Sequence, residues 1–223
     1  MTAIPLPRPE EIYYPESDGK PMAETEVHWD EMVYLAEALK ERFREEADVY
    51  VGSDMCFYYV PGDRKTYVAP DIFVVRGVPK LPRGRRRRIY KLWEEGRSPS
   101  LVIEVTSAST QDEDLSKKKT LYERIGVEEY FLHDPLGEYL SPKLQGFRLR
   151  AGRYQPMQPE VDGSLLSRAT DLLLKPEGQG LRLIDASTGQ LLPTYEEIAD
   201  AKRAAEEELA RLRAEIERLR SQS

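Results

Sequence analysis

Two carboxylates interrupt apolar segments of the chain. Asp71 follows Pro70 in VAPDIFVV, and Glu104 stands near the end of the apolar run LVIEV. A carboxylate buried without a cation or several donors is strongly unfavourable, so two of them indicate a divalent metal site. Carboxylates on neighbouring strands could hold Mg, with water and a phosphate oxygen as further ligands. The spacing equally allows one acid at a strand end and the other in a structural hydrogen bond.

A lysine further along the chain could complete such a site. Asp114, Lys118 and Tyr122 lie four residues apart and share one face of a predicted helix. Lys118 can therefore point back toward the end of the strand, where a cation would orient an attacking water and stabilise charge on phosphorus oxygens. The alternative is a surface ion pair between Lys118 and Asp114.

Composition restricts the kind of metal site. Cys56 is the only cysteine, and His28 and His133 are the only histidines. A cysteine cluster, an internal disulfide and a histidine-rich site are therefore excluded, and oxygen ligands favour Mg or Mn over Zn. The formal net charge of -7 argues against a surface coated in positive charge. Nucleic-acid contacts must be local, and a partner protein could deliver the substrate.

The one strongly basic cluster lies in a predicted loop at 79–88. We expect Arg85, Arg86, Arg87 and Arg88 to contact nucleic-acid phosphates, with Tyr90 or Trp93 able to stack on a base. The alternative pairs these arginines with acidic side chains such as Glu94 and Glu95.

The patterning predicts elements that could position these residues. A helix with its N-cap at Thr25 is predicted to run to about residue 43, and a short helical stretch at 90–95 to end at Gly96. A second long helix, with a capping box of Thr110 and Glu113, should run to about residue 124 and end at Gly126. Strands are predicted at 49–60, 66–75, 99–105, 128–133, 146–155 and 180–185.

These elements predict an α+β fold with a central mixed sheet flanked by helices. The succession of strand, helix and strand over 99–133 is what a parallel crossover needs. We expect residues 1–22 to form an arm, residues 23–190 to form the domain, and residues 194–223 to form a C-terminal helix.

The C-terminal helix has its own pattern. Thr194 and Glu197 form a second predicted capping box. Alternating four- and three-residue steps then mark an a/d seam, formed by Ala205, Leu209, Leu212, Ile216 and Leu219. The helix could pair with a second chain as a short coiled coil, giving a homodimer, or lie against its own domain.

Membrane insertion is not expected. No stretch approaches the roughly 18 apolar residues that a spanning helix needs. The opening segment has neither a basic n-region nor an apolar h-region, so the expected location is the cytoplasm.

The chemistry-bearing residues also occur in a recognisable order: Pro70-Asp71, then 104–110 (EVTSAST), then Asp114, Lys118 and Tyr122, and then 126–130 (GVEEY) through Asp134-Pro135. This order resembles the Uma-type family of restriction endonuclease-like proteins, within the PD-(D/E)XK superfamily, over about residues 22–185. Thr106 stands where the superfamily signature has its lysine, and Lys118 takes that role in this resemblance.

The resemblance implies a restriction endonuclease-like core that hydrolyses phosphodiesters with Mg or Mn. Asp71 and Glu104 would be carboxylate ligands, the Val105 carbonyl a further ligand, and Glu24, in preference to Glu26, an additional acid. The leading hypothesis is a DNA endonuclease. The alternatives are a non-catalytic nucleic-acid-binding or assembly module on the same fold and a nuclease that acts on RNA.

Overall fold

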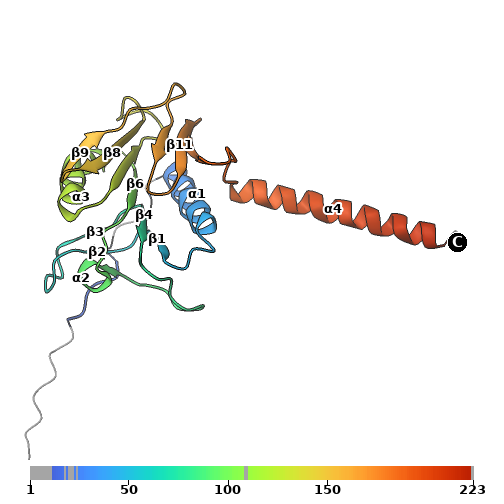
Figure 1. The fold of residues 1–223 in the computed structure, drawn as a ribbon, viewed down its shortest axis with the longest axis horizontal. Coiled ribbons are helices and arrows are strands. Elements are labelled where there is room, and N and C mark those ends of the chain that lie inside the picture. The colour runs from blue at the N-terminus through green and yellow to red at the C-terminus, as the bar shows by residue number, and fades with distance from the viewer. Residues whose placement is uncertain (1–11, 18, 20–22, 24, 108–109, 222–223) are drawn as a thin grey trace, which may run out of the picture.

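A computed structural model describes residues 12–17, 19, 23, 25–107 and 110–221 (Figure 1). Most of the predicted arm at 1–22, and Glu24 with it, lie outside the described residues. The described part of the arm contacts the domain, because Tyr58 donates its hydroxyl to the Pro15 carbonyl at 2.7 Å and Tyr14 packs edge-on to the Tyr58 ring.

The first helix begins where the sequence predicts. In α1 (Glu26–Arg42) the side chain of the N-cap Thr25 accepts a hydrogen bond from the His28 amide. Leu35 and Leu39 are fully buried, so their side of α1 faces the core, whereas the apolar side chains of Trp29 and Val33 are exposed.

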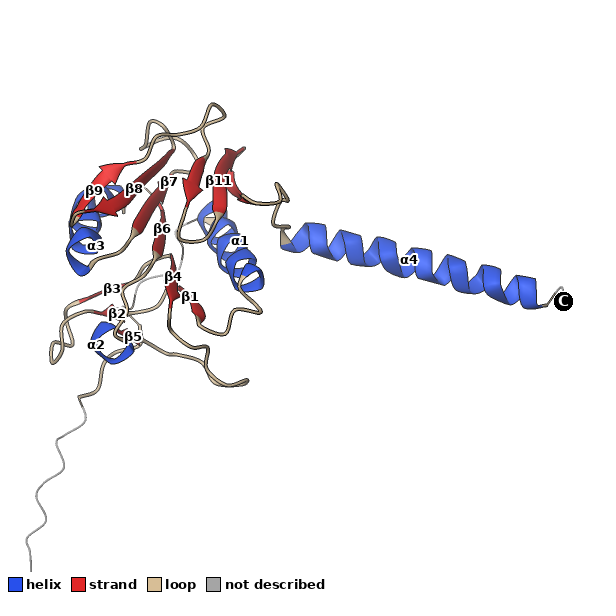
Figure 2. Ribbon diagram, in the orientation of Figure 1, coloured by secondary structure: helices blue, strands red, loops and turns tan. Residues whose placement is uncertain are grey.

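The strands form one large sheet and two small ones (Figure 2). The large sheet has the order β1-β4-β6-β7-β8-β9, in which only β6 and β7 are parallel. Its strands are β1 (Val49–Ser53), β4 (Ile72–Arg76), β6 (Leu101–Val105), β7 (Glu129–His133), β8 (Leu144–Arg150) and β9 (Arg153–Pro156). The predicted mixed sheet with its parallel crossover is therefore confirmed.

The small sheets flank the large one. One has the order β10-β11-β12, and the other has the order β3-β2-β5. Their strands are β2 (Phe57–Tyr58), β3 (Tyr67–Val68), β5 (Tyr90–Lys91), β10 (Leu165–Ser167), β11 (Leu172–Glu177) and β12 (Gly180–Asp185).

Alternation along the central strands creates two cores. Ile72, Leu101 and Ile103 face α1 and the β10-β11-β12 sheet. Their neighbours Phe73 and Val102 face the opposite side, with α3 (Lys119–Ile125) and the β3-β2-β5 sheet. Because side chains alternate between faces along a strand, Glu104 shares the α3 face with Val102.

Three predicted strands are wrong in their extent. The segment 146–155 divides into β8 and β9, because Ala151 and Gly152 turn the chain with left-handed φ values of 50° and 77°. The segment 49–60 divides into β1 and β2, which belong to different sheets, and Asp54 between them has a left-handed φ of 42°. The segment 66–75 divides at Pro70 into β3 and β4. Asp tolerates the left-handed region and Pro cannot donate to a ladder, so local backbone chemistry ends each strand early.

The helix after β6 begins at the predicted place, but its first turns differ from the prediction. Gln111 is its first helical residue, and a π turn, η1 (Glu113–Lys118), precedes α3. The capping box predicted at Thr110 is wrong, because Thr110 Oγ1 accepts instead from the Ser107 amide at 3.1 Å. The predicted end is confirmed, since Gly126 closes α3 with a φ of 82°.

The remaining helices are short α2 (Leu92–Glu95), which ends at Gly96 as predicted, and α4 (Tyr195–Arg220). The predicted capping box of Thr194 and Glu197 is present. Figure 1 shows α4 extending away from the domain, and none of its residues is buried. The alternative in which this helix lies along its own domain is therefore wrong. No helix in the described residues has the length and apolar character to cross a membrane.

Candidate active site

The two predicted carboxylates lie side by side at one end of the β4–β6 pair. Because these strands are antiparallel and Ile72 is opposite Ile103, the start of β4 meets the end of β6. The Val105 amide donates to Asp71 Oδ2 at 2.7 Å, and the Asp71 amide donates to Glu104 Oε2 at 3.3 Å. Each acid is thus fixed by the backbone of the neighbouring strand.

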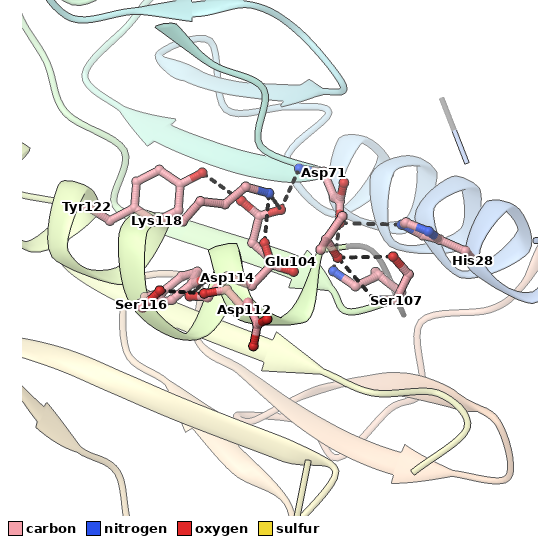
Figure 3. Close-up of polar contacts among 12 residues, drawn as sticks. His28, Asp71, Glu104, Ser107, Asp112, Asp114, Ser116, Lys118 and Tyr122 are labelled. Atoms are coloured by element: carbon pink, nitrogen blue, oxygen red, sulfur yellow. Dashed lines mark hydrogen bonds and ion pairs between the residues drawn. The ribbon is translucent and has the colours of Figure 1, made fainter. Parts of the chain in front are cut away.

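Lys118 forms ion pairs with Glu104 and Asp114. Its Nζ lies 2.9 Å from Glu104 Oε2 and 2.9 Å from Asp114 Oδ1 (Figure 3). The Tyr122 hydroxyl donates to the other oxygen of Glu104 at 2.6 Å. The four-residue spacing therefore brings Asp114, Lys118 and Tyr122 to one cluster, and the contacts survive the π turn between them.

The cluster holds more acids than cations. Glu104 and Asp114 are buried, and the Asp71 side chain is 16% exposed. Burial raises the pKa of Glu104 well above its ordinary value; Lys118 opposes this effect, whereas Asp71 and Asp114 add to it. Burial also raises the pKa of Asp114.

Lys118 responds in the opposite sense. Burial by itself would lower the pKa of the ammonium group, but Glu104, Asp114 and Asp71 together raise it above its ordinary value. Lys118 therefore carries a positive charge near neutral pH and cannot act as a general base.

The family model described as "Uma2: Putative restriction endonuclease" matches residues 3–176. The chain belongs to this family. Membership of this family supports a nuclease. In a comparison with curated proteins, none matches the chain.

A solved structure shares the fold of this Uma2 chain. It is the crystal structure of "a putative nuclease belonging to DUF820 from Anabaena variabilis ATCC 29413". The two are 17% identical with a TM-score of 0.51, over 72% of this chain and 83% of the other. At this identity the likeness concerns the fold alone, and it confirms the predicted α+β class.

Restriction endonuclease-like families generally use divalent metals, and the acid cluster fits one. In the described residues, no three His, Cys, Asp or Glu side chains are arranged to hold an ion by themselves. Mg needs fewer, because it keeps several waters and takes one or two carboxylates with substrate phosphates. A divalent cation would stabilise the ionised form of the buried carboxyl groups around Lys118, whose pKa values are raised by burial.

The Val105 carbonyl points toward the side of β6 on which Asp71 lies. Its amide donates to Asp71, so it faces β4, and the N–H and C=O of one strand residue point to the same side. Asp71, Glu104 and this carbonyl are the residues of the Uma2 chain that could hold the ion. Glu24, the additional acid that the resemblance implies, lies outside the described residues.

His28 is a site neighbour that the sequence analysis missed. Its Nε2 lies 3.5 Å from Asp71 Oδ2, and its side chain is only 8% exposed. The scarcity of histidine and the position of His28 in the first turn of a predicted helix were the available signals. Its proximity to Asp71 depends on how the start of α1 sits against the end of β4.

The basic loop is less uniform than its sequence. Arg87 Nε and Nη2 donate to both Glu95 oxygens, and the guanidinium lies 4.5 Å from the centre of the Tyr50 ring. Arg87 is therefore a structural residue, and the predicted pairing with Glu95 holds for it. Arg85 and Arg86 are exposed, while Arg88 is exposed and contacts Glu16.

The aromatic part of that prediction is partly wrong. Tyr90 is fully buried and donates its hydroxyl to the Arg97 carbonyl at 2.6 Å, so it cannot stack on a base. Trp93 is partly buried and packs against Tyr14.

A groove of about 560 Å³ adjoins the acid cluster. Lys118 reaches its wall, which also includes Lys117, Arg124, Tyr59 and Tyr67. The Arg124 guanidinium lies 6.0 Å from the centre of the Tyr59 ring. Cationic and aromatic side chains therefore gather on one side of Lys118.

A larger groove, of about 810 Å³, lies between α1, β12 and the start of α4. Its described lining does not include Asp71, Glu104 or Lys118, and acids outnumber basic residues along it. Such a wall would repel a phosphodiester, so the smaller groove suits a nucleic acid better.

Proposed function

We propose that this Uma2 protein is a Mg- or Mn-dependent endonuclease that hydrolyses DNA phosphodiesters at Asp71, Glu104 and Lys118. The observation that carries the proposal is the surplus of buried carboxylates around one lysine, beside a groove with basic walls. A carboxylate cluster that served only stability would gain from more donors and fewer acids.

Asp71, Glu104 and the Val105 carbonyl would hold the ion, with Glu24 as a further acid. A bound divalent cation would supply charge neutralisation at the scissile phosphate and would lower the pKa of a nearby water. Asp71 and Glu104 are already oriented for this task, because each is fixed by a backbone amide.

Lys118 acts as a cation. Since three carboxylates raise its pKa, it holds its proton and donates hydrogen bonds to the attacking water or to a phosphorus oxygen. A positive charge fixed before substrate arrives stabilises the negative charge that develops on the phosphoryl group.

Tyr122 and Asp114 position that machinery. Tyr122 donates to Glu104 Oε1, which leaves Oε2 to Lys118. Asp114 holds the lysine ammonium from the opposite side at 2.9 Å. The helical face therefore sets both the rotamer of Lys118 and the orientation of the carboxylate.

The substrate path follows the groove beside Lys118. Lys117 and Arg124 are exposed there and can neutralise phosphates on either side of the scissile bond. Arg85, Arg86 and Arg88 would add contacts further along the nucleic acid. The formal net charge of -7 keeps unaided binding weak and salt-sensitive, so a partner protein would help deliver the substrate.

The test is cleavage of plasmid DNA with Mg, Mn or EDTA by the wild-type chain, Asp71→Asn, Lys118→Ala and Lys119→Ala. Lys119 is the matched control, because it follows Lys118 in the helix but lies over the Phe147 ring at 3.6 Å. We expect metal-dependent nicking that falls about 100-fold or more in the first two variants and persists in the control.

The substrate is tested with the same proteins. Cleavage of RNA in preference to DNA would change the proposed substrate and leave the proposed active-site residues unchanged. Metal-independent cleavage, or equal cleavage by Asp71→Asn and wild type, would contradict the assignment. Metal-independent binding to nucleic acid without cutting would favour the non-catalytic module.

A further inference from the structure

Helix α4 exposes an apolar seam along its length. Leu209, Leu212 and Ile216 are 47%, 47% and 50% exposed. The 26 residues of α4 extend over about 39 Å. Helices that do not pack are marginal in water, so a helix of this kind needs a partner for its apolar face.

The steps of the seam assign heptad positions. Tyr195, Lys202, Leu209 and Ile216 occupy a positions, and the d positions are Ile198, Ala205, Leu212 and Leu219. Charged residues flank this core. The g positions hold Ala201, Glu208 and Glu215, and the e positions hold Ala199, Glu206, Arg213 and Arg220.

These flanking charges favour one orientation of two identical helices. In a parallel pair each g residue faces the e residue five positions later on the partner, which joins Glu208 to Arg213 and Glu215 to Arg220. By symmetry each pair forms twice. In an antiparallel pair g faces g and e faces e. Glu206 at e could then meet an arginine, but the g positions hold only Glu and Ala, so Glu208 and Glu215 would face no cation.

The charges have no stronger use within the single helix. Glu208 accepts from Arg211 at 3.0 Å, but both side chains are more than half exposed, and such pairs contribute little. A lysine at a single a position, here Lys202, is a feature that fixes register in two-stranded coiled coils at some cost in stability.

We propose that α4 pairs with α4 of a second copy of this chain as a parallel, in-register, two-stranded coiled coil. Both domains then lie at the same end of the coiled coil. Resting on the proposed function, this arrangement holds two nuclease centres on one side of the dimer, where they can address the two strands of one duplex. The dimer itself does not depend on that function.

The first experiment measures mass in solution by sedimentation of the full chain at tens of micromolar. We expect twice the chain mass of 25.7 kDa. Glu208→Arg with Glu215→Arg places Arg opposite Arg in the parallel pair, and should weaken dimerisation about tenfold or more. The matched control is Glu207→Arg with Glu217→Arg, which makes the same charge change on the outer face and should leave the dimer intact.

The second experiment measures orientation. Ile216→Cys lies at an a position, so two copies meet in a parallel pair and form a disulfide on mild oxidation. In a fully overlapped antiparallel pair the same positions are roughly 25 Å apart. Glu217→Cys, on the outer face, is the control, and the native Cys56 is buried.

The outcomes separate cleanly. A dimer that the inner charge reversal weakens, and that Ile216→Cys links much faster than Glu217→Cys, supports the proposal. A monomer, a higher oligomer, an equal response to both charge reversals or no preferential linkage overturns it. Because α4 has no buried residue, unchanged thermal unfolding of the domain shows that each variant is folded. If the wild-type chain forms this dimer but does not cleave nucleic acid, the proposed function fails and the dimer proposal stands.

Discussion

Glu104 and Glu129 are both buried glutamates on neighbouring strands of one sheet, and their surroundings differ in charge balance. Glu129 accepts from Arg148 Nε at 2.8 Å, from the Ser167 hydroxyl at 2.6 Å and from the amides of Arg168 and Ala169. Glu104 shares one lysine with two other acids. Glu129 ties β7 to the β10 strand region, whereas Glu104 lies among acids that outnumber the one lysine beside them.

The difference shows how a structural carboxylate can be separated from one proposed to be functional. Both are buried and both have a basic partner, so burial and an ion pair do not distinguish them. The neighbouring acids do: Glu104 accepts from Lys118, Tyr122 and the Asp71 amide, but it lies beside two further acids, Asp71 and Asp114. A carboxylate that several donors surround is stable as it stands, and a carboxylate among other acids gains from an added cation.

Glu31 in α1 is an intermediate case. Its Oε1 accepts from the Leu181 amide at 2.9 Å, and His133 Nε2 lies 3.9 Å away. Burial raises the pKa of Glu31 to about 8, and burial lowers the pKa of His133 to about 4, so the histidine is neutral near pH 7. One amide donor is too few to keep this carboxyl charged.

The largest expected effect is on catalysis by Glu104→Gln. The change removes a proposed ligand and the partner of Lys118, so kcat/KM for DNA cleavage should fall about 1,000-fold or more. The unfolding temperature should stay the same or rise, because the change removes one carboxyl group from a cluster in which acids outnumber cations. The contrasting variant is Glu129→Gln, whose folded fraction should cleave at nearly the wild-type rate. Equal losses in both would break the comparison.

The largest expected effect on stability comes from Glu129→Ala. It leaves Arg148 Nε and the Ser167 hydroxyl without their acceptor, which should cost about 3 kcal/mol in the free energy of unfolding. Chemical denaturation of the metal-free protein measures this loss. Glu128→Ala, at an exposed neighbour, should change it little. A loss below about 1 kcal/mol for Glu129→Ala would show that Glu129 is not the structural carboxylate described here.

The pH dependence of Glu31→Gln sharpens the intermediate case. Between the ordinary value of 4.5 and about 8, the folded carboxyl holds a proton that the unfolded chain has lost. This group therefore lowers stability progressively as pH rises through that window, and the effect levels off above it.

Glu31→Gln removes this dependence because the carboxamide does not ionise, and its oxygen can still accept from the Leu181 amide. Relative to wild type, the variant should gain on the order of 3 kcal/mol between pH 5 and pH 9. Unfolding at both pH values measures the gain. Glu37→Gln, on the exposed side of the same helix, should show little change in stability between these pH values. If Glu31→Gln gains no more stability than Glu37→Gln, the raised pKa of Glu31 is refuted.

The smallest effects separate the arginines of the basic loop. Arg87→Ala breaks the pair with Glu95 and the contact with Tyr50, and should cost about 1–2 kcal/mol in unfolding. Arg86→Ala should leave stability within about 0.5 kcal/mol. If Arg86 contacts phosphate, its loss should weaken DNA binding and reduce the slope of log affinity against log salt by about 1. An unchanged slope would remove the loop from the substrate path.

The sequence by itself determined the features that depend on near neighbours. The apolar runs around Asp71 and Glu104 marked buried acids, because an acid within such a run stands out. Four-residue spacing selected Lys118, and caps at Thr25 and Thr194 located two helix starts. The heptad seam of α4 follows from residues within one helix. Periods of two and of three to four residues are local properties, so they can be predicted from the chain alone.

Only the tertiary structure decided how distant segments meet. It paired β4 with β6, which set Asp71 beside Glu104, and it brought His28 of α1 to Asp71. It paired Arg87 with Glu95. It also surrounded Glu129 with four donors and placed Glu104 beside other acids. These outcomes depend on strand order, on helix placement and on the net charge of a shared cavity. Such long-range quantities leave no local period in the sequence, because each depends on residues that only folding brings together.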